Sequence, residues 1–192
     1  MIAILKYRIL FITILFGAFG GALSLLLKIE DMKNYYPSLA VLIALAVTLL
    51  ISFLIKAKWE TSFRNKLKIA ATVLFILFLI SAFLHTYYVI DRTFEYREFD
   101  QVNRYVKGDY SFAAIEYKKK HLYQKDEEAL YNEFGGTGGI EIYWTKESIN
   151  KNILLLIITY CCLVMFFVGC ISLLVEILSS KYSKSTKKTH TL

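Results

Sequence analysis

The stretch NILLLIITYCCLVMFFVGCISLLV, residues 152–175, runs for 24 residues without a charged side chain. A lipid hydrocarbon core of about 30 Å is crossed by roughly 20 apolar residues in a helix that rises about 1.5 Å per residue. Backbone amides find no water in lipid, so only a helix satisfies their hydrogen bonds over a run of this length. The stretch therefore predicts a transmembrane helix.

Three further uncharged runs have similar lengths: 19 residues at 9–27, 22 at 34–55 and 22 at 69–90. Buried helices of a soluble core are the alternative, but four of them would leave too little polar surface in a chain of 192 residues. The first run also has the features of a signal peptide, although it is longer than the usual apolar region of about 7 to 15 residues. We predict an all-α integral membrane protein with four transmembrane helices, at 9–27, 35–55, 69–90 and 152–178.

Charge divides the remaining segments into two sets. The residues before 9, those at 56–68 and those after 175 carry 11 Lys and Arg but only two acids, whereas 28–34 and 91–151 carry 12 Lys and Arg and 14 acids. Lys and Arg in short loops mark the cytoplasmic side of a membrane. We therefore predict that the N-terminus at 1–8, the basic loop at 56–68 and the tail at 179–192 are cytoplasmic. The loop at 28–34 and the segment 91–151 are then extracytoplasmic, in a multi-pass protein of the plasma membrane.

The formal net charge of +7 would suit a nucleic-acid partner in a soluble protein. Here the basic excess lies in the predicted cytoplasmic segments, where it contacts anionic headgroups of the lipid bilayer. We expect the bilayer as a partner and no nucleic acid.

Small and aromatic residues indicate how the helices pack and where they meet the headgroups. Small residues four apart allow two helices to approach closely in lipid. We interpret them as contacts inside the bundle, with a homo-oligomer contact as the alternative; they are Gly17 and Gly21 in the first run and Ala40 and Ala44 in the second. Aromatic belts are expected at both headgroup levels, and the candidate interface anchors are Tyr35, Tyr36, Trp59, Tyr87 and Tyr88.

Side chains with catalytic potential are sparse in the runs. The candidate polar or functional residues are His85, near the outer end of the third run, and Glu176, near the inner end of the fourth, although both positions also fit the headgroup level. The three cysteines all lie in the fourth run, where they fit apolar packing. The three histidines fall on both sides of the membrane, so they cannot form one metal site. We expect no catalytic, cofactor-binding or metal site, and a protein that is not an enzyme.

The segment 91–151 is predicted to be a small, mainly helical domain, with an α+β domain as the alternative. Apolar residues at helical spacing predict that the third helix continues outward to residue 107. Ser111 is a candidate cap for a second helix, and 125–134 predicts a short helix with acids in its first turn. The glycines at 135–139 predict a flexible turn, and the alternation of Ile140, Ile142 and Trp144 predicts a short strand.

The outward segment holds 11 tyrosines and phenylalanines, more than a core of this size needs. Exposed aromatics suit recognition of a partner; a thin core sealed against the headgroups is the alternative. We expect a non-enzymatic protein whose outward domain binds, senses or neutralises a protein partner, as an accessory subunit, a sensor or an immunity-type protein does. An oligomeric pore is the second hypothesis, and a membrane-embedded enzyme is the third.

The predicted orientation is tested by single introduced cysteines. A cysteine at Asn103 should react with a membrane-impermeant thiol reagent in intact cells, because the segment 91–151 faces outward, whereas one at Ser62 should not. Both should react after the membrane is permeabilised. The reverse pattern in intact cells would contradict the orientation.

Overall fold

The computed structural model describes residue 14 and residues 29–55, 61–98 and 101–188. This part of the chain is mostly helical and contains one small two-stranded sheet. Three of its helical segments are long and apolar enough to cross a membrane, namely Glu30–Leu54, Asn65–Arg92 and Lys146–Leu178. The predicted first span, 9–27, lies outside the described residues apart from residue 14.

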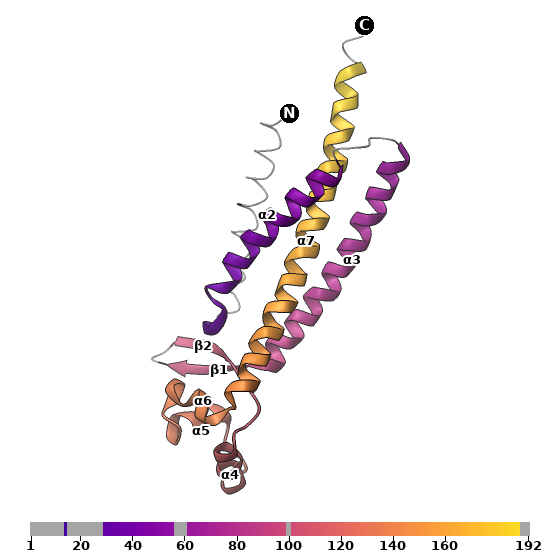
Figure 1. Cartoon of the computed structure of the whole chain (residues 1–192). Helices are drawn as coiled ribbons and strands as arrows, with labels where there is room; N and C mark the ends of the chain where they lie inside the picture. Colours follow the sequence, from indigo (N-terminus) through magenta and orange to yellow (C-terminus); the bar gives the residue numbers. More distant parts are fainter. Residues whose placement is uncertain (1–13, 15–28, 56–60, 99–100, 189–192) are drawn as a thin grey trace.

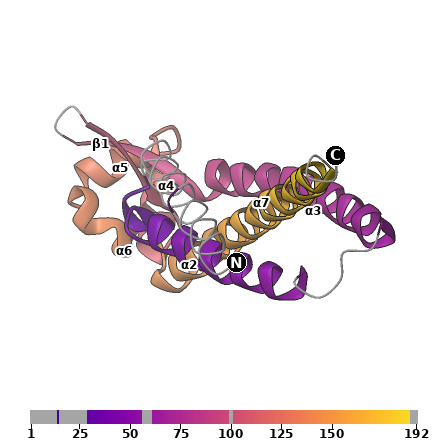
Figure 2. The same ribbon diagram turned by 90° about the horizontal axis from the view of Figure 1, so that it is seen from above.

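The three long helices are α2 (Tyr35–Ile55), α3 (Thr61–Arg92) and α7 (Lys146–Lys188). Helix α7 packs against both of the others and runs alongside them in both views (Figures 1 and 2). Its 43 residues make it about 65 Å long at 1.5 Å per residue. Because a lipid core of about 30 Å needs less than half of this length, the polar ends of α7 can extend beyond it.

A regular stripe on α7 forms the centre of the bundle. Leu156, Tyr160, Val164 and Val168 recur at every fourth residue and have no exposed surface. Side chains four residues apart lie on the same face of a helix. In α2, Ala40 and Ala44 have the same spacing, are also fully buried and belong to the same apolar cluster. Small side chains on α2 thus face larger ones on α7, which allows close packing. Gly17 and Gly21 lie outside the described residues.

A β-hairpin, and not a continued helix, follows α3. Strand β1 (Thr93–Glu98) pairs antiparallel with β2 (Gln101–Val106), with Thr93 opposite Val106 and Glu98 opposite Gln101. The prediction that the third helix runs to residue 107 is therefore wrong. Aromatic and β-branched residues fit a pleated, half-buried surface, and the cross-strand pair Phe94–Tyr105, with ring centroids 6.0 Å apart, uses them in that way.

The rest of the segment between the hairpin and α7 is helical. It contains α4 (Phe112–Lys120), α5 (Asp126–Asn132), the 3-10 turn η2 (Gly136–Gly139) and α6 (Ile140–Tyr143). The predicted cap is confirmed, because Ser111 Oγ accepts a hydrogen bond from the Ala114 amide. The predicted acids in the first turn of α5 are also confirmed. Residues 93–145 are called the connecting domain below, and they gather at the N-terminal end of α7 (Figure 1).

The predicted strand at 140–144 is wrong, because these residues form α6 and its C-cap. A strand would place consecutive side chains on opposite faces. Here the neighbours Tyr143 and Trp144 are both fully buried, whereas Ile142 is exposed. The helical turn, closed by the Trp144 amide on the Ile140 carbonyl at 2.9 Å, directs both large rings into the core. Tertiary packing therefore decided the conformation against the local alternation.

The segment before α2 docks onto the hairpin. It forms a short 3-10 turn, η1 (Glu30–Met32), and Ile29 makes a parallel bridge with Arg104 in β2. The Val106 amide donates a hydrogen bond to Asp31 Oδ2 at 3.0 Å. This contact ties the start of α2 to the connecting domain, although the two are about 75 residues apart in sequence.

The glycine-rich turn contains two different uses of glycine. Gly135 and Gly136 have φ of 78° and 69°, a left-handed conformation that glycine adopts readily. Gly139 instead has an ordinary φ, but an added Cβ would lie 1.7 Å from the Phe134 carbonyl oxygen. Gly138, one residue earlier, has nothing within 4 Å of such a Cβ. Close approach of the backbone therefore requires glycine at 139 and not at 138.

Gly139→Ala and Gly138→Ala form a matched pair that tests this packing. We expect Gly139→Ala to destabilise the connecting domain by about 1–3 kcal/mol, because the backbone must move away from the new methyl group. Hydrogen exchange of the Glu133 and Trp144 amides, which are hydrogen-bonded within α5 and α6, should accelerate roughly tenfold or more. Gly138→Ala should exchange like the wild type. Equal exchange in the two variants would contradict the close packing at Gly139.

Candidate functional site

The half-buried carboxylate of Asp126 joins three elements of the connecting domain. Lys118 Nζ, from α4, donates to Asp126 Oδ1 at 2.6 Å, and the Tyr143 hydroxyl, from α6, donates to the same atom at 2.9 Å. The Tyr110 hydroxyl lies 3.0 Å from both carboxylate oxygens and accepts a hydrogen bond from Lys118 Nζ at 2.7 Å. Asp126 begins α5, so this one side chain holds α4, α5 and α6 together.

The electrostatics of this cluster favour its charged form. Burial raises the pKa of Asp126, but hydrogen bonds from Lys118, Tyr143 and Tyr110 outweigh burial and hold the pKa below its ordinary value. Burial lowers the pKa of Lys118, and its hydrogen bonds to Asp126 and Tyr110 reverse that effect and raise the pKa. Burial and then the Asp126 carboxylate raise the pKa of Tyr143. At neutral pH the cluster is therefore a fixed ion pair that supports the domain, and none of these three groups is poised to exchange a proton.

Aromatic rings fill the interior of the connecting domain. Trp144 packs against Phe94 of the hairpin with ring centroids 4.5 Å apart and against Tyr143 at 4.8 Å. Phe134 packs edge-on against Tyr143 at 4.9 Å and against Tyr117 at 5.6 Å. Edge-to-face pairs at these separations contribute beyond area burial alone. Part of the aromatic excess seen in the sequence is thus explained by a thin core.

Another part of the aromatic excess lies on the surface. Tyr123 is 98% exposed and Phe112 is 83% exposed, at the two ends of the α4 segment. Further exposed apolar side chains occur in the same helix, the turn after it, α5 and α6: Ile115, Leu122, Tyr131 and Ile142. Scattered exposed apolar residues are normal on a soluble surface. Six of them lie within the residues 112–142, and we refer to these six exposed side chains together as the α4 surface.

The candidate residue His85 lies inside the bundle. It is 3% exposed, and Nδ1 lies 3.0 Å from Thr159 Oγ1 of α7. Its ring packs 5.8 Å from those of Tyr36 in α2 and Tyr160 in α7. Those two tyrosines stack at 4.1 Å, and the Tyr160 hydroxyl donates to the Tyr36 carbonyl at 2.9 Å. His85 therefore takes part in a polar contact among three helices, and it does not reach toward the headgroups.

Thr159 lies within hydrogen-bond distance of two backbone carbonyls as well as of His85. The Thr159 hydroxyl is 3.0 Å from the Leu155 carbonyl oxygen and 3.1 Å from that of Leu156. A hydroxyl has one hydrogen, so Thr159 donates either to one of these carbonyls or to His85 Nδ1, according to the tautomer of His85. His85 Nε2 and the Tyr36 hydroxyl lie in the interior and have no partner among the described residues. Such groups are commonly satisfied by buried water.

The candidate interface anchors fall into different environments. Tyr35 and Tyr87 are exposed, Tyr88 is half-buried against the core, and Tyr36 has no exposed surface at all. Tyr36 is thus available to protein and not to headgroups. Trp59 lies outside the described residues. Glu176 is half-buried in α7 and takes part in contacts there.

The sequence did not single out several residues that the fold brings together. Thr159 gave no signal, because a threonine inside an apolar run is common. Asp126 was recognised only as one of the acids in a helix start, since its partners are 8 and 17 residues away along the chain. Within the described ranges, no group of three or more His, Cys, Asp or Glu is placed to hold a metal ion.

No protein-family model, curated protein or solved structure compared with the chain matches it.

Acid titration tests the role of Asp126. A carboxyl group whose pKa is lowered on folding stabilises the folded state at pH values above its ordinary pKa of 3.8. This stabilisation is lost as the pH falls through the lowered pKa. We expect Asp126→Asn to be less stable than the wild type by about 1–3 kcal/mol at neutral pH, measured by unfolding of the purified protein. The difference should shrink as the pH is lowered below about 4.

Glu116→Gln is the matched control for this titration. Glu116 pairs with Lys120 on the exposed side of α4, where both side chains are more than half exposed. Its removal should change stability by less than about 0.5 kcal/mol at any pH. A difference between Asp126→Asn and wild type that stays constant down to strongly acidic pH would contradict the lowered pKa.

Proposed function

We propose that this chain is a non-enzymatic, four-span plasma-membrane protein that presents its connecting domain outside the cytoplasm to bind a protein partner. An accessory subunit, a sensor and an immunity-type protector all act in this way. The observation that carries the proposal is the α4 surface, with Tyr123 and Phe112 almost fully exposed on a domain stabilised by its own ion pair and aromatic core. Exposed aromatics on a rigid support are typical of binding hot spots.

The arrangement of the helices supports the membrane placement. Helices α2 and α3 expose apolar side chains over most of their length, for example Phe53, Phe83 and Ile90. In water such a surface would promote aggregation, whereas lipid covers it without cost. The connecting domain gathers at one end of these helices, whereas α2 ends and α3 begins at the other end (Figure 1). The predicted loop 56–68 is helical from Thr61 onward, and the start of α3 carries the basic residues Arg64, Lys66 and Lys68. Together with the positive-inside rule, this arrangement supports the proposal that both termini are cytoplasmic and that the connecting domain lies outside.

An oligomeric pore remains the second hypothesis. The interior shared by α2, α3 and α7 is filled with side chains such as Leu156, Val164 and Val168. A water-filled path through these described helices of one copy therefore has no room, and a pore would have to form between copies. A membrane-embedded enzyme is the third hypothesis, and no contact among the described residues favours it over the other two.

Partner binding is tested with the full chain purified from its native membrane. We expect one protein to co-purify in fixed ratio and to lose at least roughly tenfold in recovery with the double variant Phe112→Ser and Tyr123→Ser, because loss of hot-spot side chains costs about 2 kcal/mol or more. The control is Lys119→Ser with Lys120→Ser, two exposed positions between them on the α4 segment.

The outcome also separates the two main hypotheses. Unchanged recovery of the partner with the apolar double variant would contradict the role of the α4 surface. Ion conductance by the purified chain in lipid vesicles, with no co-purifying partner, would instead favour the pore.

A further inference from the structure

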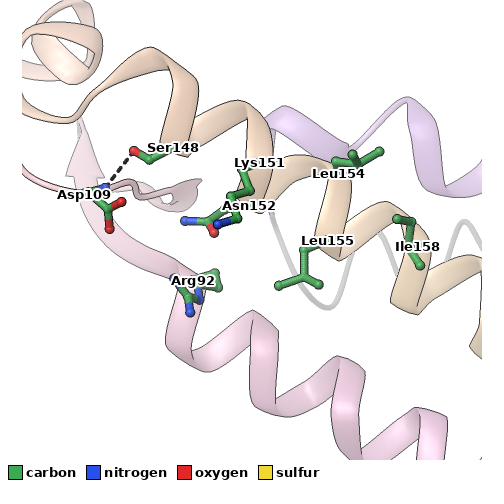
Figure 3. Close-up of a pocket in the computed structure, with 8 residues that line it drawn as sticks. All are labelled: Arg92, Asp109, Ser148, Lys151, Asn152, Leu154, Leu155 and Ile158. Atoms are coloured by element: carbon green, nitrogen blue, oxygen red, sulfur yellow. Dashed lines mark hydrogen bonds between the residues drawn. The ribbon is translucent and has the colours of Figure 1, made fainter.

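A cavity of about 250 Å³ lies where the connecting domain meets the long helices. Figure 3 shows its walls: Arg92 at the end of α3, Asp109 in the turn after β2, and six residues on the first turns of α7. The six are Ser148, Lys151, Asn152, Leu154, Leu155 and Ile158. This cavity is separate from the α4 surface and from the contact between His85 and Thr159.

The end of the cavity near the connecting domain is polar and rigid. Asn152 is buried and donates a hydrogen bond to the Lys107 carbonyl at 2.7 Å. The Asp109 amide donates to Ser148 Oγ at 2.7 Å (Figure 3). A Cβ added at Gly108 would lie 2.2 Å from Ser148 Oγ, so the turn approaches α7 as closely as glycine allows. These contacts hold Arg92 and Lys151 on facing elements.

Basic side chains outnumber acidic ones in the lining, with Arg92 and Lys151 against Asp109. The Arg92 guanidinium pairs with the neighbouring Asp91 carboxylate, with Nε 2.7 Å from Oδ2. Lys151 is exposed and forms no ion pair with any part of the chain that the structure describes. Asp109 is the single carboxylate in the lining, and its backbone amide donates to Ser148 Oγ. A guanidinium and an ammonium group that line the same cavity are suited to a phosphate.

The other end of the cavity is apolar. Leu154 and Ile158 are more than half exposed, and Leu155 lies between them. The change from Lys151 to Ile158 takes seven residues, or about 10 Å along the helix. These residues begin the stretch of α7 that is apolar enough to cross a membrane. The lining therefore passes from cations to hydrocarbon over the distance that separates a lipid headgroup from its acyl chains.

We propose that this cavity binds an anionic phospholipid, with the phosphate between Arg92 and Lys151 and one acyl chain along Leu154, Leu155 and Ile158. The lining changes from basic to apolar side chains in the order in which a phospholipid changes from phosphate to acyl chain. A free phosphate would leave the apolar half of the cavity uncovered. The bound lipid would join α3, the turn at Gly108 and α7. The inference rests on the membrane placement of α3 and α7 and does not depend on partner binding.

Native mass spectrometry of the full chain tests the proposal, with vesicles of phosphatidylcholine and phosphatidylglycerol as the source of lipid. The wild type should retain phosphatidylglycerol in preference to phosphatidylcholine. The double variant Arg92→Gln and Lys151→Gln should bind it about thirtyfold more weakly, since each of the two basic groups near anionic lipid contributes about 1 kcal/mol. The control, Lys119→Gln with Lys120→Gln, removes the same charge from the exposed face of α4 and should retain lipid like the wild type.

A second measurement uses only the wild-type chain, so it does not depend on folding of a variant. Acylation of Lys151 by an amine reagent should be several-fold slower in phosphatidylglycerol vesicles than in phosphatidylcholine vesicles, and Lys119 should react at the same rate in both. Equal protection of the two lysines would overturn the site, as would equal lipid retention by the two double variants. Displacement of the lipid by inorganic phosphate alone would show a free-anion site and overturn the lipid assignment.

Discussion

The contact between Tyr160 and Tyr36 is the interaction on which the rest of the structure depends. The Tyr160 hydroxyl donates to the Tyr36 carbonyl, the two rings stack at 4.1 Å, and His85 packs beside both of them. Apolar burial gives little drive for helix association in lipid, so polar contacts and close backbone approach must supply it. Here one site joins α2, α3 and α7. A backbone carbonyl oxygen has two lone pairs, so the Tyr36 carbonyl can accept from the Tyr160 hydroxyl in addition to a hydrogen bond within α2.

Fixing the start of α2 against α7 also fixes the connecting domain. The short segment before α2 carries Asp31, whose carboxylate accepts the Val106 amide at the end of the hairpin. From the other side, Asn152 of α7 holds the Lys107 carbonyl, and the Lys107 amide donates to the Arg92 carbonyl at the end of α3. The base of the hairpin is therefore held by three hydrogen bonds, with Asp31, Asn152 and Arg92 as the partners in the bundle. A segment of this size buries only a modest core, and the hydrogen bonds at these three points help to offset the conformational entropy that it loses on folding.

Two regions of the molecule have side chains whose chemistry is suited to a binding partner. The α4 surface exposes aromatic side chains to water, although the domain already has an aromatic core around Trp144. The cavity beside Arg92 and Lys151 combines two cations with an apolar wall. We propose a protein partner for the first region and an anionic lipid for the second. Because both are attached to the same anchored hairpin, the membrane and a partner would act on one rigid unit, and neither region needs a reactive side chain.

Length and charge in the sequence were sufficient to predict the helices at 35–55, 69–90 and 152–178, because a long uncharged run has few other stable conformations near lipid. Local capping was sufficient for α4 and α5, since Ser111 and the acids after Lys125 act within one turn. The hairpin, α6 and the burial of His85 and Tyr36 were decided only by the tertiary structure. At 91–107 the apolar pattern fits a helix as well as a hairpin, and the contacts with Asp31 and Trp144 that select the hairpin come from distant parts of the chain. His85 and Tyr36 lie at the ends of apolar runs, where a sequence cannot distinguish a side chain that faces lipid headgroups from one that faces another helix. That distinction depends on the rotation of each helix about its axis, which is set by packing against its neighbours.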